Sequence, residues 1–218
     1  ELTQQHLLQY LNICKNSGNL LAALVNSILD LNQIRASTIR LYPEKVNVKE
    51  FLDDLVNLFE VQCAQKNITL HLDIGSNLSR EIYTDRNRLS QILINLLGNS
   101  LKFTTHGKIS IITRQPKNHF DHVEFNIIDT GIGIKEKDKK KLFKIFGKLE
   151  QNDTRVNKEG VGLGLTIADN LARLLCENDD LSGIKLQSEY GKGSSFSFYI
   201  KKQLQETQIV QPRLSTSL

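Results

Sequence analysis

The sequence predicts an α+β fold, a two-layer α/β sandwich in which helices cover one face of a mixed, mostly antiparallel sheet, preceded by one long helix. Two observations lead to this prediction. Apolar residues over positions 1–36 recur at alternating four- and three-residue steps, which is the spacing of a helix that pairs with other helices. Beyond Pro43, which ends that helix, short strand-like runs alternate with stretches of helical period.

The first helix carries a narrow apolar seam. Its members are Leu7, Leu11, Cys14, Gly18, Leu21, Val25 and Ile28. Such a seam is typical of helix pairing, although an ordinary amphipathic helix packed on its own domain has the same spacing.

Strands and helices follow in a regular order. Asp85 is expected to cap the central helix, because its side chain can accept hydrogen bonds from the first free N–H groups. We expect strands near Val46–Val48, Ile68–Asp73, Glu81–Tyr83, 108–114, 122–128, 183–188 and 194–201, and helices at about 49–66, from Asp85, at Lys135–Phe146 and at 163–177. The chain then divides into residues 1–40, residues 41–202 and a tail at 203–218 without a regular period.

Composition excludes several classes of protein. The net charge of +4 is diffuse and no basic patch is interleaved with aromatic residues, so no nucleic-acid partner is expected. Cys14, Cys63 and Cys176 are scattered and lack metal-ligand spacing, which suits reduced thiols in a cytoplasmic protein. No apolar run approaches the roughly 18–20 residues of a membrane span. The chain begins at Glu1 and contains no methionine, so we expect a segment of a longer parent, whose membrane anchorage stays open.

Four short segments carry the functional signal. They are Asn95–Phe103, Asp129–Gly133, Gly160–Leu165 and Gly191–Phe196. Each alone is weak, because glycine-rich stretches are common in loops. Together and in this order they resemble the N box and the three glycine-containing boxes of the histidine-kinase ATP-binding domain, in the superfamily shared with gyrase, MutL and the heat-shock chaperone ATPases. The resemblance covers nearly the whole chain, and it implies an ATP site.

The N-box segment lies on the helix that begins near Asp85. Asn95, Asn99 and Lys102 are spaced at i, i+4 and i+7, so their side chains converge on one groove. An amide oxygen is a hard, neutral ligand for Mg²⁺, and a lysine ammonium can face phosphates. The resemblance implies that Asn99 ligates Mg²⁺, that Asn95 completes the metal site, and that Lys102 and Phe103 lie beside the nucleotide.

Asp129 ends the apolar strand VEFNIID, which would place its carboxylate at the edge of a buried pocket. A carboxylate accepts from an exocyclic amine such as that of adenine, and offers nothing favourable to the O6 of guanine. Gly131 and Gly133 let the backbone approach the base and turn sharply. The resemblance assigns the aspartate to the adenine amine, and either Ser194 or Ser195 adds a contact to the same base.

The third segment supplies a phosphate-binding turn. Glycines before a helix leave backbone N–H groups and a favourable dipole for phosphate. Its expected binding residues are Gly160, Gly162, Leu163, Gly164 and Leu165. By resemblance, residues 147–159 form a lid, Phe143 and Phe146 anchor it, and Arg155 reaches the γ-phosphate. Glu159 stands where the family usually has glycine, and the lid is one residue longer than is typical, so the lid geometry stays open.

The position of Asn95 indicates the reaction. Hydrolytic members of the superfamily carry a glutamate there to activate water, and an amide cannot act as a general base. Phosphoryl transfer instead needs alignment and charge neutralisation, in which Lys102 can take part. None of the five histidines lies in an acceptor motif.

We therefore expect the ATP-binding catalytic domain of a two-component sensor histidine kinase. Residues 20–34 resemble the second helix of the dimerisation hairpin, and the acceptor histidine would lie on the first, outside this chain. The expected partners are that acceptor helix, a response regulator or fused receiver domain, and a second copy in a homodimer. The alternative is a nucleotide-responsive interaction module without phosphotransfer. A gyrase-type hydrolase and a protein-serine kinase of the same superfamily are weaker alternatives.

Overall fold

The computed structural model describes residues 4–139, 142, 162–177 and 179–204. The chain divides into two compact units, Glu1–Ile39 and Arg40–Leu218. Each unit is described by itself. Within the described residues, no helix combines the length and the apolar character that crossing a membrane would require.

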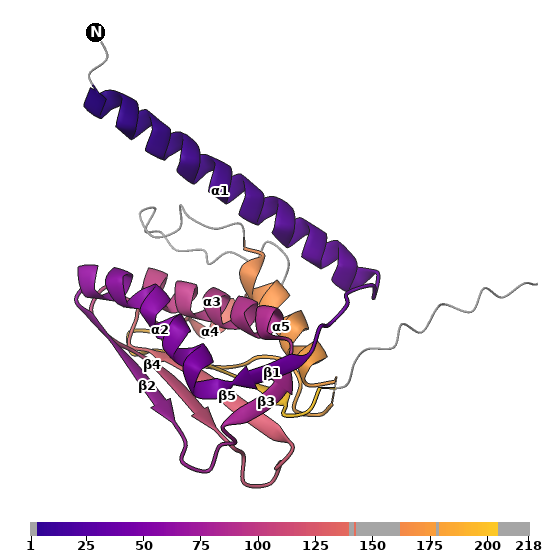
Figure 1. Cartoon of the computed structure of the whole chain (residues 1–218). Coiled ribbons are helices and arrows are strands. Elements are labelled where there is room, and N and C mark those ends of the chain that lie inside the picture. The colour runs from indigo at the N-terminus through magenta and orange to yellow at the C-terminus, as the bar shows by residue number, and fades with distance from the viewer. Residues whose placement is uncertain (1–3, 140–141, 143–161, 178, 205–218) are drawn as a thin grey trace, which may run out of the picture. The chain divides into compact units, whose positions relative to one another are not determined.

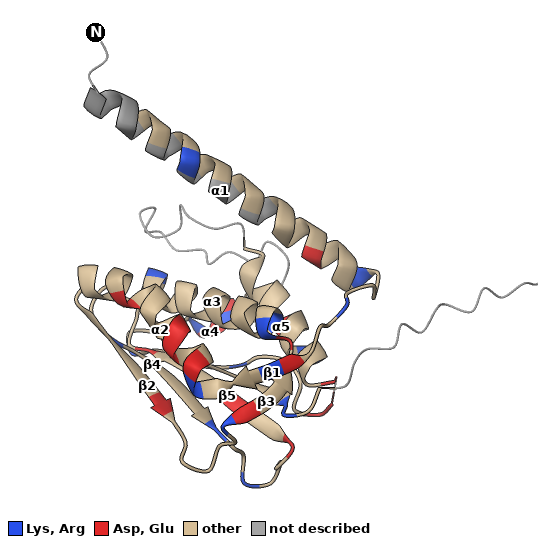
Figure 2. Ribbon diagram, viewed as in Figure 1, with Lys and Arg blue, Asp and Glu red and all other residues tan. Residues whose placement is uncertain are grey.

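The first unit consists of the long helix α1, Gln4–Arg35 (Figure 1). Its charged residues are Lys15, Asp30 and Arg35, so the helix is almost free of charge along its length (Figure 2). Several members of the predicted seam, among them Leu21 and Val25, are exposed. A helix thus occupies most of the span 1–36 in which one was expected, and its pairing with other helices stays a prediction.

The second unit is built on a five-stranded sheet in the order β2-β4-β5-β7-β6. The strands are β2 (Ile68–Ile74), β4 (Gly107–Arg114), β5 (His122–Asp129), β7 (Gly193–Lys201) and β6 (Lys185–Glu189). The β2–β4 pair is parallel, and the other pairs are antiparallel. The prediction of a mixed, mostly antiparallel sheet is therefore confirmed.

Helices cover one face of this sheet (Figure 1). They are α2 (Val48–Gln65), α3 (Arg86–Phe103) and α5 (Gly164–Leu175), and a short helix α4 (Glu136–Lys139) follows β5. The core lies between the two layers, where alternate strand residues meet the apolar stripe of α3. Its fully buried members include Leu89, Ile92, Leu93, Leu96, Ile109, Ile111, Phe125, Ile127, Phe198 and Ile200.

Two side-chain caps set where helices begin. Asn47 accepts hydrogen bonds from the N–H groups of Lys49 and Glu50, and Asp85 accepts from the N–H of Arg88 at 3.0 Å. The predicted cap at Asp85 is confirmed. Val48, which was expected at the end of a strand, is instead the first residue of α2, because Asn47 already starts the helix.

A second, two-stranded sheet pairs β1 (Glu44–Asn47) with β3 (Glu81–Thr84). Gln203 forms a bridge with Tyr83, and Leu204 is buried and donates its N–H to the carbonyl of Tyr83. These two residues of the expected tail thus pack on the domain. Of the helix expected at Lys135–Phe146, the structure describes Glu136–Lys139 as helical, and most of the remainder lies outside the described residues.

Candidate functional site

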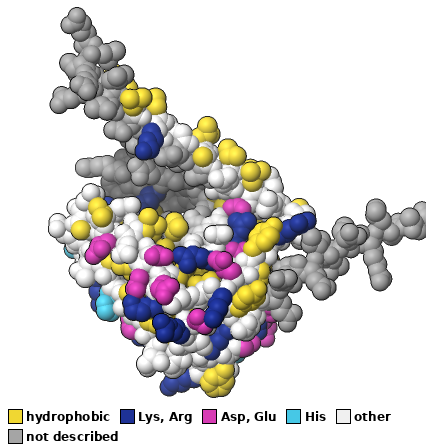
Figure 3. Space-filling model, in the orientation of Figure 1, with side chains coloured by type: hydrophobic (Ala, Val, Ile, Leu, Met, Phe, Trp, Pro, Cys, Tyr) yellow, Lys and Arg dark blue, Asp and Glu magenta, His cyan; other side chains and the backbone are white. Residues whose placement is uncertain are grey.

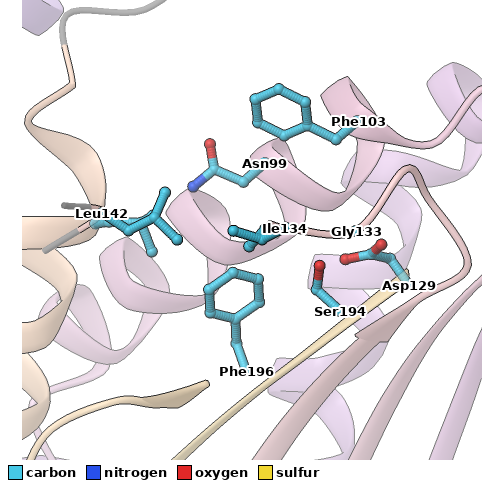
Figure 4. A pocket seen from close by; sticks show the side chains of 9 residues that line it. Asn99, Phe103, Asp129, Gly133, Ile134, Leu142, Ser194 and Phe196 are labelled. Carbon is cyan, nitrogen blue, oxygen red and sulfur yellow. The ribbon is translucent and has the colours of Figure 1, made fainter. Parts of the chain in front are cut away.

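A pocket opens between α3, the loop after β5, the start of α5 and β7 (Figure 4). Its volume, including the open mouth, is about 370 Å³. It is lined by Asn99, Phe103, Asp129, Gly133, Ile134, Leu142, Leu165, Ser194 and Phe196. Apolar walls with a few convergent polar groups are what a site for a flat, partly polar ligand needs.

Asp129 is the buried carboxylate of this pocket. It ends β5, and only 5% of its surface is exposed. One carboxylate oxygen, Oδ1, accepts the N–H of Gly131 at 2.9 Å, and the other, Oδ2, accepts the hydroxyl of Ser100 at 3.3 Å. Burial raises the pKa of Asp129, while hydrogen bonds from Gly131, Ser100 and Ser194 oppose that rise. The group is an acceptor that a ligand N–H can reach from the pocket.

Glycines let the backbone pack tightly around Asp129. A β-carbon at Gly131 would lie 2.5 Å from the carbonyl oxygen of Phe103. At Gly133, where φ is +65°, it would overlap the carbonyl of Glu189. At Gly193, where φ is +122°, it would overlap the carbonyl of Asp129 itself. No other residue fits these positions, so the second and fourth glycine segments interlock at the base of the pocket.

Helix α3 contributes Asn99 and Phe103 to the pocket, one turn apart (Figure 4). Lys102 does not line the pocket, and its ammonium lies 5.2 Å from the centre of the Phe103 ring. Asn95 lies one turn before Asn99 and donates its amide to the carbonyl of Gln91 at 3.0 Å. The helix therefore has the predicted polar residues, but only Asn99 lines the pocket, and Asn95 and Lys102 do not.

Asn95 also marks where α3 meets the third glycine segment. A β-carbon on Gly164 would lie 2.6 Å from the side-chain oxygen of Asn95. Gly164 is the first residue of α5, and Leu163 before it is buried and provides no side-chain cap. The first N–H groups of α5 thus lie next to the amide of Asn95, where a helix dipole favours an anion.

The predicted residues therefore fall into three groups. Asn99, Phe103, Asp129, Gly133 and Leu165 line the pocket. A second group lies near the first and consists of Asn95, Lys102, Gly131, Leu163 and Gly164, and Gly162, with a positive φ, comes just before α5. Phe146, Arg155 and Gly160, together with Phe143 and the expected lid at 147–159, lie outside the described residues.

Strand register separates the two candidate serines. Ser194 is paired with Asp129 across β7 and β5, and both side chains face the pocket (Figure 4). Ser195 points to the other face, where its hydroxyl donates to Asn126 at 2.8 Å. Of the two, Ser194 is thus the one that lines the pocket.

Several site residues were missed by the sequence argument. Phe196 lies two residues after Ser194, so strand alternation could have placed it in the pocket. Ile134 and Leu142 read as ordinary core residues. The Ser188 hydroxyl accepts the N–H of Ile134 and donates to the carbonyl of Gly193, both at 2.9 Å. No sequence signal distinguishes such a serine, because its partners come from two separate segments, the loop after β5 and the start of β7.

The amide groups of α3 fit a Mg²⁺ ion on chemical grounds. Asn99 presents its amide in the pocket, and the side-chain oxygen of Asn95 faces the start of α5. Both are hard, neutral oxygen donors of the kind that Mg²⁺ accepts alongside phosphate oxygens.

Comparisons with known proteins agree with this geometry. The family model for histidine kinase-, DNA gyrase B- and HSP90-like ATPases matches residues 84–204. Hybrid signal transduction histidine kinase B of Dictyostelium discoideum is 34% identical over 194 residues, covering 88% of this chain and 10% of that protein. Signal transduction histidine-protein kinase BarA of Escherichia coli (strain K12) is 34% identical over 206 residues, covering 93% of this chain and 22% of that protein. The chain therefore spans less than a quarter of the length of these curated relatives.

Solved structures show the same fold. Full-length ShkA in complex with AMPPNP superimposes with a TM-score of 0.76 at 26% identity, covering 95% of this chain and 41% of that chain. The catalytic domain of histidine kinase ThkA, in one of its nucleotide-free forms, superimposes with a TM-score of 0.58 at 26% identity, covering 74% of this chain and 99% of that chain.

Proposed function

Because this chain belongs to the family of histidine kinase-, DNA gyrase B- and HSP90-like ATPases, we propose that it is the ATP-binding catalytic domain of a sensor histidine kinase. In this proposal it transfers the γ-phosphoryl group of ATP to a histidine on a dimerisation helix outside the chain. The transfer forms a bond between phosphorus and an imidazole nitrogen and releases ADP. Its relatives are named as hybrid or signal transduction histidine kinases, which supports this member of the family over the others.

The Asp129 pocket is the observation that carries the proposal. A buried carboxylate beside apolar walls suits adenine, whose exocyclic amine donates to it while the ring contacts Phe103, Ile134 and Phe196. Guanine presents a carbonyl oxygen at that position, and two acceptors facing each other in a buried site are unfavourable. The pocket therefore favours ATP over GTP.

The phosphates would extend along α3 towards the start of α5. There Lys102 offers a positive charge, and the first N–H groups of α5 offer hydrogen bonds. Asn99 and Asn95 would hold a Mg²⁺ ion, which neutralises phosphate charge when it is bound. Asn95 cannot deprotonate water, which favours transfer to a side chain over hydrolysis.

The remaining partners follow from the proposed kinase role. A response regulator, or a receiver domain fused to the parent, would take the phosphoryl group from the histidine. Helix α1 would form half of a dimerisation hairpin, since its exposed apolar residues and its scarcity of charge suit a helix interface. We propose a cytoplasmic location for this part of the parent.

Phosphotransfer to an acceptor supplied in trans tests the proposal. The chain is incubated with Mg²⁺, ATP labelled at the γ-phosphate, and acceptor hairpins taken from several relatives. We expect label on a hairpin that is lost in acid and retained in alkali, as for phosphohistidine, and no label with Asn99→Ala. ATP binding without any transfer would favour the interaction module, and release of free phosphate at a comparable rate would favour a hydrolase.

A further inference from the structure

Helix α3 contacts Asp129 through a residue that the pocket lining does not include. Ser100 is only 1% exposed, and its hydroxyl donates to Oδ2 of Asp129 at 3.3 Å. Asn99, its neighbour in the chain, faces the pocket instead (Figure 4). Ser100 therefore reaches the carboxylate from the buried side of the helix, opposite the space that a ligand would occupy.

The position of Ser100 would suit an apolar residue on packing grounds alone. Leu96, Leu97 and Leu101 are buried around it on the same helix. A hydroxyl in such surroundings is unfavourable unless it has a partner, and alanine is the better helix former. Asp129 is the partner that the structure provides. The serine is thus better explained by the carboxylate than by the core.

The Asp129 carboxylate depends on such donors. Its partners come from three elements, namely Ser100 on α3, the N–H of Gly131 in the following loop and the N–H of Ser194 on β7. All three are neutral donors, and burial works against them by raising the pKa of the group. A protonated carboxyl at this place would present a donor where the adenine amine needs an acceptor.

Ser194 serves a different network although it lies in the pocket. Its hydroxyl is 3.1 Å from that of Ser188, which in turn binds the backbone of Ile134 and Gly193. These contacts join the loop after β5 to the turn before β7. The two serines near Asp129 thus have separate tasks.

We propose that Ser100 is a positioning residue for nucleotide binding, whose hydroxyl holds the Asp129 carboxylate in one orientation and in its accepting, ionised form. The inference rests on the proposed function of the pocket, since it concerns the group that would select adenine. Ser100 acts through Asp129 and need not touch the ligand. The Ser100 hydroxyl would therefore allow the protein to bind ATP at lower pH than it could without this hydroxyl.

The test compares the wild-type chain with Ser100→Ala, Ser100→Thr and the matched control Ser195→Ala, whose hydroxyl bonds to Asn126 on the other face. Calorimetry gives the Kd for ATP with Mg²⁺ between pH 5.5 and 8.5. Carboxyl ¹³C NMR of the ATP-free proteins gives the titration of Asp129 directly. Thermal unfolding checks that each variant is folded.

We expect Ser100→Ala to bind ATP up to about tenfold more weakly than the wild type at the acidic end of the range, and the loss of affinity to shrink as the pH rises, because protonation of Asp129 moves to higher pH. Ser100→Thr should restore the profile if the added methyl group is accommodated, and Ser195→Ala should match the wild type. In the NMR titration, Asp129 of Ser100→Ala should protonate at higher pH than in the wild type.

Two results would overturn the inference. One is an unchanged Asp129 titration in Ser100→Ala, and the other is a loss of ATP affinity that is equal at every pH, as expected from a packing defect. Absence of ATP binding by the wild type at all pH values would instead contradict the proposed function. The NMR titration would still decide whether Ser100 controls Asp129, so the two failures are distinguishable.

Discussion

Gly133 shows how single residues shape the pocket. Its φ of +65° lies in the left-handed region, and its α-carbon packs against the backbone of Glu189 and Tyr190. Gly191 also has a positive φ, +86°, but no atom lies within 4 Å of where its β-carbon would be. Substitutions at these two glycines therefore distinguish the cost of a positive φ from the cost of steric overlap.

We expect Gly133→Ala to lower the free energy of unfolding by at least ~2 kcal/mol, because left-handed strain of ~1–2 kcal/mol adds to displacement of the Glu189 backbone. Gly191→Ala should cost only the strain, about 1 kcal/mol. Gly98→Ala lies inside α3 in open space and should stabilise by about 0.5–1 kcal/mol. Urea unfolding measures all three, and equal effects for Gly133 and Gly191 would contradict the packing described for the pocket.

Motif spacing was enough to place Asn99 and Asp129 in the site, because each lies at a fixed offset from an element with a clear period. The choice between Ser194 and Ser195 required the β5–β7 register, which sequence periodicity does not supply. Ser100 was missed because its position on the buried face of α3 reads as core. Its role becomes visible only when Asp129, 29 residues further on, lies against it.

At the scale of elements, a cluster of polar and charged side chains around the buried His122 joins the start of β5 to the end of α5. His122 is almost fully buried, and its ring nitrogens lie 2.8 Å from Oδ1 of Asp121 and 2.7 Å from Oδ2 of Asp179. Lys201 on β7 lies 2.7 Å from Asp121, and the Cys176 thiol donates to Asp179. The same β5 and α5 carry Asp129 and Gly164 at their opposite ends. The cluster thus ties together two elements that position the pocket.

The composition of this cluster also resembles that of a metal site. Ligand atoms of His122, Cys176 and Asp179 lie within 4.8 Å of one another. Burial and the neighbouring Asp179, however, raise the pKa of Cys176 to about 12, which keeps the thiol protonated. The 2.7 Å between His122 and Asp179 is the length of a direct hydrogen bond. We therefore interpret the cluster as a hydrogen-bond network and not as a metal site.

The cluster should make the stability of the domain sensitive to acid. The hydrogen bond from Lys201, aided by His122, lowers the pKa of Asp121 to about 2. Burial alone would raise the pKa of Asp179, but hydrogen bonds from Cys176 and others lower it below its usual value. Both carboxylates have lower pKa values folded than unfolded, so they stabilise the domain above about pH 4 and lose that contribution as pH falls towards 2.

We therefore expect the free energy of unfolding of the wild type to fall between about pH 4 and pH 2. The Asp179→Asn variant should be less stable above pH 4, and its free energy of unfolding should fall less steeply over the same range. Asp53→Asn is a suitable control, because Asp53 pairs with Lys49 on the exposed surface of α2. Urea unfolding at several pH values measures these slopes. Parallel curves for the wild type and Asp179→Asn would show that the cluster does not set the acid response.

Sequence periodicity predicted the order of the described helices and strands, since each amphipathic stretch faces one common core. It could not predict the contacts of Gln203 and Leu204 with Tyr83, because the pairing joins segments about 120 residues apart. Val48, the first residue of α2, was instead assigned to the preceding strand, because a β-branched residue beside a strand looks like part of that strand.

At the scale of the whole molecule, the surface carries charges of both signs, whereas the first helix carries few charges. Positive and negative side chains are interspersed over the face seen in Figure 3. That distribution agrees with the modest net charge of +4 and gives no basic stripe on this face for nucleic acid. Helix α1 carries several exposed apolar residues and few charges.

Nucleotide binding tests the central claim most directly. Calorimetric titration of the chain with ATP and Mg²⁺ is compared with the same titration with GTP. The wild type is also compared with Asp129→Asn, which keeps the shape of the side chain but replaces one acceptor oxygen with a donor group. We expect saturable binding of ATP, no detectable binding of GTP, and at least about a tenfold loss of ATP affinity in the variant. Equal binding of ATP and GTP, or an unchanged affinity in Asp129→Asn, would contradict the assignment of this pocket to adenine.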